Sequence, residues 1–436
     1  MEEGQTSEFF GEAKKLQENN EFESALSCYN KALKLFRQWG NTEDEAETLL
    51  EMGNVYINLE DYTRSSEYYG LALKLYKKLK DITGQGYSLT GLALVNEKRE
   101  EYELSRSYYR KAIKKFRKNQ DYDREAIVLS MMARTYEFQG SWEDALMDYR
   151  RANSVYEKIQ NTSGSEETLR LIETIQKKRS KVRSFRRKVL TVLIYLAALM
   201  AAEIVTAYYS VEMGIVMHVG ILFALLINSS LVKEQNFSYL LMSMMVLPMI
   251  RILGHTIPGL VHIEQLYWFP IIAVPLFGAS YVIMKVQGLG LKNVGFQWGN
   301  LKLQILVALT GVILGTVEYF ILKPHALIPH FTLQWVLFGA LILIISTGFA
   351  EELLFRGIIQ KNVENVFGCV FGLIYTSLIF TAMHIGWNSF LDLIFVFCVA
   401  MFYGYTFQKT RSLLGITLSH GISNTFLFLI VPFLLG

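Results

Sequence analysis

The sequence predicts an all-α protein in which a helical repeat solenoid is followed by a polytopic bundle of eight or nine transmembrane helices. Three observations lead to this prediction: a forty-residue internal repeat, long apolar segments later in the chain, and a sharp drop in charged residues after about Lys188. A chain of 436 residues with 51% apolar content is too long for one domain and too apolar for an ordinary soluble enzyme. We therefore expect a repeat domain at 1–176, a basic juxtamembrane linker at 177–188 and a transmembrane domain at 189–436.

Positions forty residues apart carry the same kind of side chain in the first part of the chain. Five such sets each have one member in every unit: Ala32, Ala72, Ala112 and Ala152; Tyr29, Tyr69, Tyr109 and Tyr149; Phe36, Tyr76, Phe116 and Tyr156; Phe22, Tyr62, Tyr102 and Trp142; Ala13, Gly53, Ala93 and Ala133. Within a unit, the small residue of the last set predicts close helix contact, and the entry aromatic marks the turn into a second helix. One helix pair cannot bury its apolar face alone, so four stacked pairs would share a continuous core.

This pattern, from about Ser7 to Gln160, resembles the tetratricopeptide repeat in a forty-residue form. The aromatic and alanine positions themselves are expected in the core. The resemblance implies a concave groove that binds a peptide or a partner protein.

Basic residues crowd the segment 177–188, directly before the first long apolar segment. Such residues stay in the cytoplasm beside a first membrane span, so the repeats are expected to be cytoplasmic, with anionic lipid headgroups as a further contact. The acidic, polar N-terminus predicts no cleavable signal peptide. Three widely spaced cysteines predict neither a disulfide framework nor a cysteine zinc site, and we expect no nucleic-acid partner.

Nine apolar segments then follow, most of them close to the roughly 20 residues that a membrane-spanning helix needs. They are Val189 to Tyr209, Met213 to Val232, Phe237 to Leu253, Leu266 to Val286, Leu303 to Leu322, Leu333 to Gly348, Phe367 to Met383, Phe390 to Phe407 and Leu413 to Leu435. Glu203 inside the first is expected to be a helix-packing or interfacial residue rather than part of a site. Five histidines outside any cluster are expected in loops or at interfaces: His218, His255, His262, His325 and His330.

Three polar clusters interrupt the last apolar segments, and the first contains Glu351, Glu352 and Arg356. A charge at the middle of a membrane helix costs roughly 2.5 to 3.5 kcal/mol on insertion scales, so these residues need a compensating role. Glu352 and Arg356 stand four apart, so on a helix they lie on one face and form an ion pair. Glu351 is rotated by about 100° from Glu352 and stays available for chemistry.

The second and third clusters place Phe380 with His384, and His420 with Asn424, at the same four-residue spacing. If these helices converge, Glu351 is the candidate general base that takes a proton from water. His384 would orient that water, and His420 with Asn424 would donate hydrogen bonds to the oxyanion that forms on a peptide carbonyl. The hypothesis is peptide hydrolysis without a covalent intermediate.

The order Glu-Glu-x-x-x-Arg, Phe-x-x-x-His and His-x-x-x-Asn resembles the CAAX protease and bacteriocin-processing family of intramembrane proteases, over about 266–435. The loop Leu289 to Phe296 is similar to one that precedes this family's core. The resemblance implies an intramembrane peptidase with Glu351 as base, Glu352 and Arg356 as a structural pair, and His384, His420 and Asn424 completing the site. The resemblance allows prenylated C-terminal peptides, bacteriocin precursors or other membrane-associated chains as substrates, and the sequence does not select among them.

A metal ion is left open by the sequence. The family is often labelled metalloprotease, and two histidines with a carboxylate are able to hold zinc, which makes His384 and His420 possible ligands. No His-Glu-x-x-His signature occurs.

Two other functions compete with the protease. One is a catalytically silent, membrane-anchored interaction scaffold whose polar clusters serve packing. The other is a proton-coupled transporter, for which internally similar halves are expected but not seen in the sequence. For the protease, the helix from Leu333 is expected to continue to about Asn365, which places Glu351 at mid-depth.

Overall fold

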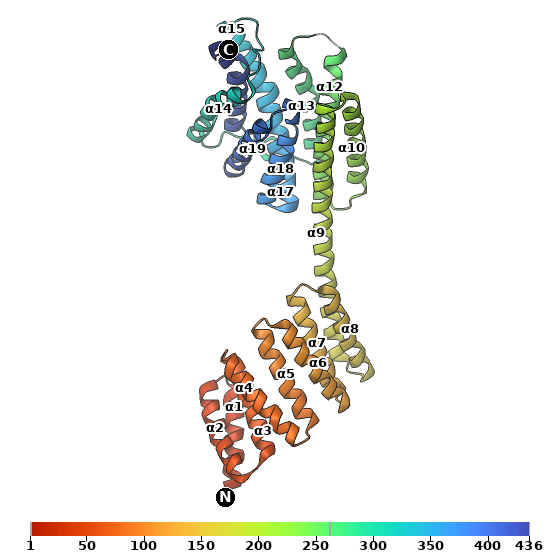
Figure 1. The fold of residues 1–436 in the computed structure, drawn as a ribbon, viewed down its shortest axis with the longest axis vertical. Helices are drawn as coiled ribbons and strands as arrows, with labels where there is room; N and C mark the ends of the chain where they lie inside the picture. The colour runs from red at the N-terminus through yellow and green to blue at the C-terminus, as the bar shows by residue number, and fades with distance from the viewer. Residues whose placement is uncertain (1, 261–262, 436) are drawn as a thin grey trace. The chain divides into compact units, whose positions relative to one another are not determined.

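The computed structural model describes residues 2–260 and 263–435, and the side chains of 8–256 and 263–435. Every regular element in these ranges is helical, so the predicted all-α class is confirmed (Figure 1). The chain divides into two compact units, Met1–Arg186 and Arg187–Gly436.

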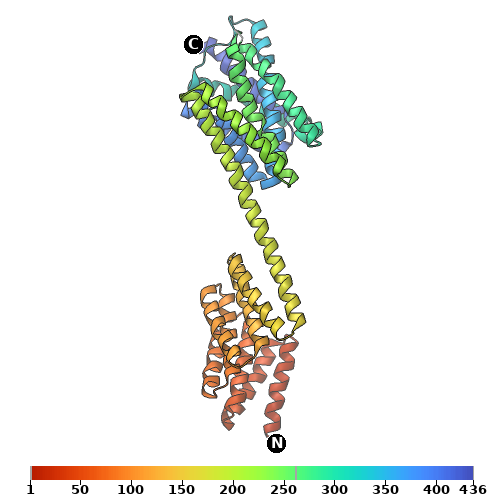
Figure 2. The ribbon, with the colours of Figure 1, turned by 90° about the vertical axis from the view of Figure 1, so that its right-hand side faces the viewer.

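The first unit is a stack of helices of nearly equal length. They are α1 (Glu2–Glu18), α2 (Phe22–Trp39), α3 (Thr42–Asn58), α4 (Tyr62–Lys78), α5 (Ile82–Lys98), α6 (Tyr102–Lys118), α7 (Tyr122–Phe138) and α8 (Trp142–Lys158). Each helix packs against its neighbours along the chain, and the stacking is visible from two directions (Figures 1 and 2).

A residue with a left-handed backbone conformation lies in the turn between successive helices, at every twentieth position. Two of these residues are Gly40 and Gly140, and the others are Asn20, Glu60, Lys80, Glu100, Gln120 and Gln160. Several helices then begin at a side-chain cap; the Asp61 carboxylate, for example, accepts from the Arg64 backbone N–H. The forty-residue period in the sequence is therefore two turns and two helices.

The repeated positions form the core of this unit, as predicted. The four tyrosines of the Tyr29 set are at most 2% exposed, and the four alanines of the Ala32 set are fully buried. The entry aromatics are the first residues of α2, α4, α6 and α8. The small residue Gly53 lies close to the next tyrosine, since a Cβ at Gly53 would lie 2.8 Å from the Tyr69 ring.

Helix α9 (Thr162–Tyr208) begins in the first unit, where Ile172 and Ile175 pack beside Tyr149. The basic run at 177–188 is a stretch of this helix. Its later part carries the first of nine helices in the described residues that are long and apolar enough to cross a membrane.

The candidate spans of the second unit follow the predicted apolar segments. After α9 they are α10 (Val211–Leu231), α11 with α12 (Gln235–Met244 and Val246–Leu260), η1 with α13 (Gln265–Tyr267 and Trp268–Val286), α14 (Leu301–Leu322), the span Leu333–Phe367, α18 with η5 (Cys369–Ala382 and Ile385–Trp387), α19 (Phe390–Thr410), and α20 with η6 and α21 (Leu414–Thr425, Phe426–Ile430 and Val431–Leu435). Their length and composition indicate a multi-pass membrane protein.

The span Leu333–Phe367 is one continuous 35-residue helical segment, as expected from the position of Glu351. It comprises α15 (Leu333–Leu343), η3 (Ile344–Phe349), α16 (Ala350–Glu352), η4 (Leu353–Gln360) and α17 (Lys361–Phe367), of which η3 and η4 are π-helical. The predicted loop at 289–296 packs against its later part, where Lys361 Nζ donates to the Asn293 carbonyl at 2.8 Å.

Candidate active site

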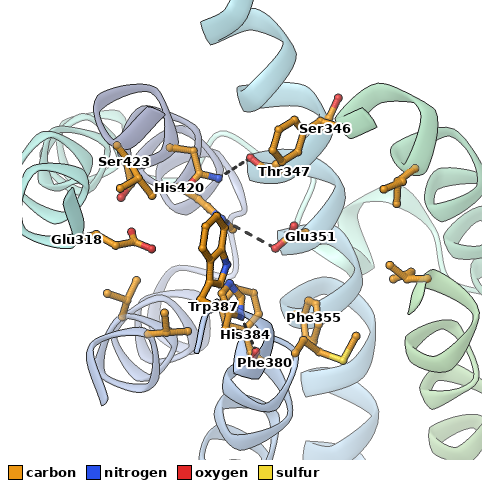
Figure 3. A pocket seen from close by; sticks show the side chains of 18 of the residues that line it. Glu318, Ser346, Thr347, Glu351, Phe355, Phe380, His384, Trp387, His420 and Ser423 are labelled. Carbon is orange, nitrogen blue, oxygen red and sulfur yellow. Dashed lines mark hydrogen bonds and ion pairs between the residues drawn. The ribbon is translucent and has the colours of Figure 1, made fainter. Parts of the chain in front are cut away.

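A cavity of about 290 Å³ lies among the helices of the second unit. Its walls come from α12, α13, α14, the span Leu333–Phe367, the end of α18, α19 and α20. Most lining side chains are aliphatic or aromatic. The polar and charged ones include Glu318, Glu351, His384 and His420 (Figure 3). A mostly apolar cavity with a small number of convergent polar groups is the usual form of an active site.

Glu351 and Glu352 lie on the short α-helical turn between the two π-helices. π-Helical turns are rare and occur often at functional sites. The two carboxylates point differently, as the 100° rotation predicts. Glu351 lines the cavity and is 31% exposed, whereas Glu352 is fully buried.

Glu352 is held by two partners. Its Oε2 lies 3.2 Å from Arg356 Nε, which is the predicted ion pair, and its Oε1 lies 2.9 Å from His420 Nδ1. Arg356 also donates to the Ala400 carbonyl, and its guanidinium lies 4.5 Å above the Phe380 ring. Glu352 therefore orients a histidine in addition to pairing with the arginine.

His420 stands between the two glutamates. Its Nε2 lies 4.0 Å from Glu351 Oε2 on the cavity side (Figure 3). Behind it, the Tyr403 ring stacks on the imidazole at 6.0 Å, and the Tyr403 hydroxyl shares a hydrogen bond with Ser419 Oγ. The imidazole is thus fixed in position and orientation.

His384 comes just after the last turn of α18. Its Nδ1 is 2.9 Å from the Phe380 carbonyl, which only accepts, so Nδ1 carries a proton, and in the neutral form of this ring Nε2 is an acceptor (Figure 3). Phe380 also packs on this ring at 4.7 Å. The Phe-x-x-x-His spacing serves both contacts.

Asn424 lines the cavity one turn after His420. Its amide Nδ2 donates to Thr347 Oγ1 at 2.8 Å, so the side chain is anchored to η3. The other N–H of this amide has no hydrogen-bond partner among the described residues.

Two glycines on α14 let α20 pack close to it, and α20 carries His420 and Asn424. A Cβ at Gly311 or Gly315 of α14 would fall on the Ser419 or Ser423 carbonyl oxygen of α20, inside van der Waals contact. Gly311 and Gly315 form a G-x-x-x-G pair, which lets membrane helices approach to backbone contact. Gly348 makes a similar approach to α20 from the other side.

The structure thus brings all six residues named from the sequence to one cavity or its wall. Glu351, His384, His420 and Asn424 line it, and Glu352 and Arg356 lie directly behind. The sequence reasoning missed Glu318, which also lines the cavity from α14 (Figure 3). A lone acid in an otherwise apolar span was the available signal.

The isolated histidines behave less uniformly than expected. His325 and His330 lie in the loop after α14, and His262 is outside the described residues. His218 is not in a loop or at an interface: it is fully buried on α10, with Nε2 3.3 Å from Glu203 Oε1. The expectation was wrong because Glu203 lies buried on α9 and supplies a polar partner within the helix bundle.

A zinc ion does not fit these side chains. In residues 2–260 and 263–435, no three His, Cys, Asp or Glu side chains form a group able to hold a metal ion. We derive no step through a metal.

Residues 333–426 match the family model described as type II CAAX prenyl endopeptidase Rce1-like. The chain carries an Rce1-like domain. All six of the predicted site residues lie inside the matched segment. In the first unit, residues 85–158 match the tetratricopeptide repeat, and residues 1–119 match the model of the soluble NSF attachment protein, SNAP. These matches confirm the predicted combination of repeats with an Rce1-like domain.

Three solved structures are similar to this chain. BtubC (BKLC) from P. vanneervenii is 18% identical, with 38% of this chain and 78% of that chain covered and a TM-score of 0.30. The apo form of RapI is 14% identical, with 58% and 93% covered and a TM-score of 0.37. MamA is 20% identical, with 40% and 94% covered and a TM-score of 0.26. No curated protein matches the chain.

Proposed function

We propose that this protein is an integral membrane endopeptidase that hydrolyses a peptide bond of a membrane-associated substrate with a water activated by Glu351. The observation that carries the proposal is the arrangement of Glu351, His384 and His420 around one cavity in the bilayer part of the chain. The Rce1-like domain supports the same reaction class.

In this reaction the Glu351 carboxylate removes a proton from water while the water oxygen attacks the peptide carbonyl carbon. His384 Nε2 accepts a hydrogen bond from the other O–H of the water, and this bond fixes the direction of attack. The proton on Glu351 then passes to the amine nitrogen as the C–N bond breaks. Water is consumed, and one carboxylic acid and one amine are released.

The oxyanion formed during attack needs hydrogen-bond donors. Glu352 binds His420 through Nδ1, so a protonated His420 presents Nε2–H to the cavity. Asn424 has one amide N–H held by Thr347 and a second one for the oxyanion. The buried Arg356–Glu352 pair keeps the histidine in place.

The repeat unit is proposed to recruit the substrate or a partner protein on the cytoplasmic side. Tetratricopeptide repeats present concave surfaces to peptides. The basic stretch 177–188 of α9 precedes the first candidate span, which favours a cytoplasmic position for the repeats. The boundaries 1–176, 177–188 and 189–436 remain part of this proposal.

The test uses the purified full-length chain in liposomes with two pools of N-acetylated, quenched fluorescent peptides, one carrying a farnesylated cysteine and one without lipid. Glu351→Gln and His384→Ala are each expected to lower the cleavage rate on the order of a hundred- to ten-thousandfold, the usual contribution of acid–base groups. Insertion and monodispersity should be unchanged.

Two matched substitutions serve as controls. Glu212→Gln changes an exposed acid at the start of α10, and His325→Ala changes an exposed loop histidine; neither residue lines the cavity. Both variants should cleave like wild type. Cleavage that survives Glu351→Gln or His384→Ala removes the mechanism, and a wild-type chain that cleaves neither pool favours the membrane-anchored scaffold.

A further inference from the structure

Glu318 occupies an unusual position for a carboxylate. It lies in the α14 span, and its side chain points from that helix into the cavity, toward Trp387 (Figure 3). It follows Gly311 and Gly315 by seven and three residues, so it shares the helix face that touches α20. The same close approach that seats α20 therefore delivers Glu318 to the cavity.

Some acidic side chains around this cavity form an ion pair with a basic side chain, and others do not. Glu352 pairs with Arg356 and His420, and Glu203 pairs with Arg251 at 2.7 Å. Within the described part of the chain, Glu318 has neither a hydrogen bond nor an ion pair. The charged groups that act on it from a distance are Asp392, which has the same sign, and His420, which already lies between two glutamates.

Asp392 strengthens the negative character of this wall. It is fully buried on α19, and both of its carboxylate oxygens have no hydrogen-bond partner among the described residues. It precedes the lining residues Val396, Val399 and Tyr403 by four, seven and eleven positions, so it stands on the cavity-lining face of that helix. Two acids from two helices thus lie at this wall, and within the described part of the chain neither carboxylate has a hydrogen bond or an ion pair.

Acids inside a bilayer are costly and are normally paired. Here the nearby lining is aromatic. Trp387 stacks on Phe428 at 5.8 Å, and Phe395 also lines the cavity. A lysine or arginine side chain matches both features, because its apolar stem covers aromatic surface while its charged head reaches a carboxylate. An apolar side chain would leave Glu318 without a partner.

We infer that Glu318 is a specificity-determining residue that binds a basic side chain of the substrate peptide, with Asp392 adding negative potential. This inference rests on the proposed peptidase function. The cleaved substrate then carries a lysine or arginine near the scissile bond, and the positive charge it brings completes the cavity's ion pairing.

The experiment compares peptides that differ only in this charge. N-acetylated, quenched octapeptides carry lysine, norleucine or glutamate at each position in turn, and kcat/KM is measured with the full-length chain in liposomes. Wild type is expected to prefer lysine over norleucine at one position on the order of ten- to a hundredfold, the range that hydrogen bonds to charged groups contribute. Acetylation removes the N-terminal amine as a competing cation.

Variants at Glu318 then test whether this residue causes the preference for lysine. Glu318→Gln should bring the lysine-to-norleucine ratio close to unity, Glu318→Asp should retain part of it, and Glu318→Lys should favour the glutamate peptide. Glu212→Gln is the matched control, and its ratio should equal that of wild type. A Glu318→Gln variant that slows all peptides equally, or leaves the ratio unchanged, overturns the inference.

Failure of the inference is distinguishable from failure of the peptidase assignment. If wild type cleaves peptides and Glu351→Gln does not, the peptidase stands and the ratio alone decides the role of Glu318. If wild type cleaves no peptide of either set, both proposals fall together.

Discussion

Both units bring helices together with small residues, but they place those residues against different atoms. In the repeat unit Gly53 faces the ring of Tyr69, which is a side chain. In the membrane unit Gly315 faces the Ser423 carbonyl, which is backbone. A ring can shift by rotation, whereas a carbonyl moves only with its helix. The repeat core should therefore tolerate local change, and the membrane site should not.

The two units also differ in how far their buried ion pairs are exposed to solvent. In the repeats, Glu97 is 5% exposed and accepts from the Tyr109 hydroxyl at 2.8 Å, while its partner Arg134 remains 44% exposed. In the membrane unit, Glu352 and Arg356 are both buried almost completely. One pair is partly solvated by water, and the other depends wholly on its protein partners.

The largest effect is expected from breaking the membrane pair. Arg356→Met leaves the Glu352 carboxylate buried without its arginine, which costs about 3 to 5 kcal/mol for a pair of this kind. It also releases the group that orients His420, so cleavage should fall with stability. Thermal unfolding of the full-length chain in detergent measures the first effect.

The control for this change is Lys14→Met, because Lys14 and Glu47 are 43% and 44% exposed where they pair. Its effect should be below about 1 kcal/mol, as for other exposed pairs. Equal losses in the two variants would contradict the distinction between buried and solvated pairs.

The next largest effect is expected at the backbone contact. Gly315→Ala places a methyl group against the Ser423 carbonyl, and overpacking of this kind costs about 1 to 3 kcal/mol. The α14 and α20 helices must separate, which moves His420 away from Glu351. Thermal unfolding and cleavage rate should both decline.

Gly220→Ala is the matched control for Gly315→Ala. Gly220 also lies within a candidate span, on α10, and a Cβ there meets nothing within 4 Å. Its unfolding temperature should stay at or slightly above that of wild type, since alanine favours helix over glycine.

The sequence predicted the repeat unit almost completely because each of its rules recurs. The buried position of Tyr149 follows from that of Tyr29, and the turn at Gln160 follows from the turn at Asn20. The period and the size of the side chains are enough to predict this unit, because the same contacts recur in every repeat. The eight or nine predicted spans follow from composition alone, because the bilayer sets a minimum length, and the described residues contain nine candidate helices.

The site was predictable only where residues at helical spacing share a face. Glu352 with Arg356 and Phe380 with His384 are local pairs, so their contacts follow from a spacing of four. The bond from Glu352 to His420 joins residues 68 apart, and Glu318 reaches the cavity through glycines on its own helix. Such contacts depend on how helices pack, which a local pattern does not specify.

A moderate effect is expected at the charged contact of the repeats. Tyr109→Phe removes the hydroxyl that donates to Glu97, and a hydrogen bond to a charged group contributes about 1.5 to 3 kcal/mol. Arg134 still pairs with Glu97, so the loss should lie at the lower end. Hydrogen exchange in α5, α6 and α7 of the full-length chain should quicken.

Tyr56→Phe is a suitable comparison, because that tyrosine packs on Tyr68 without a hydrogen bond from its hydroxyl to an acid. Exchange in α3 and α4 should change little. A larger effect at Tyr56 than at Tyr109 would show that ring packing, rather than the bond to Glu97, sets local stability.

The smallest effect is expected from Gly53→Ala, the repeat counterpart of Gly315→Ala. The equivalent positions in the other units are alanines: Ala13, Ala93 and Ala133. A Cβ there would lie 2.8 Å from the Tyr69 ring, so the ring has to shift, and the helix gains about 0.8 to 1 kcal/mol of propensity in return. The net change should stay within about 1 kcal/mol of zero. A loss at Gly53 as large as that at Gly315 would mean that both units are equally intolerant of an added methyl group, whatever atom it meets.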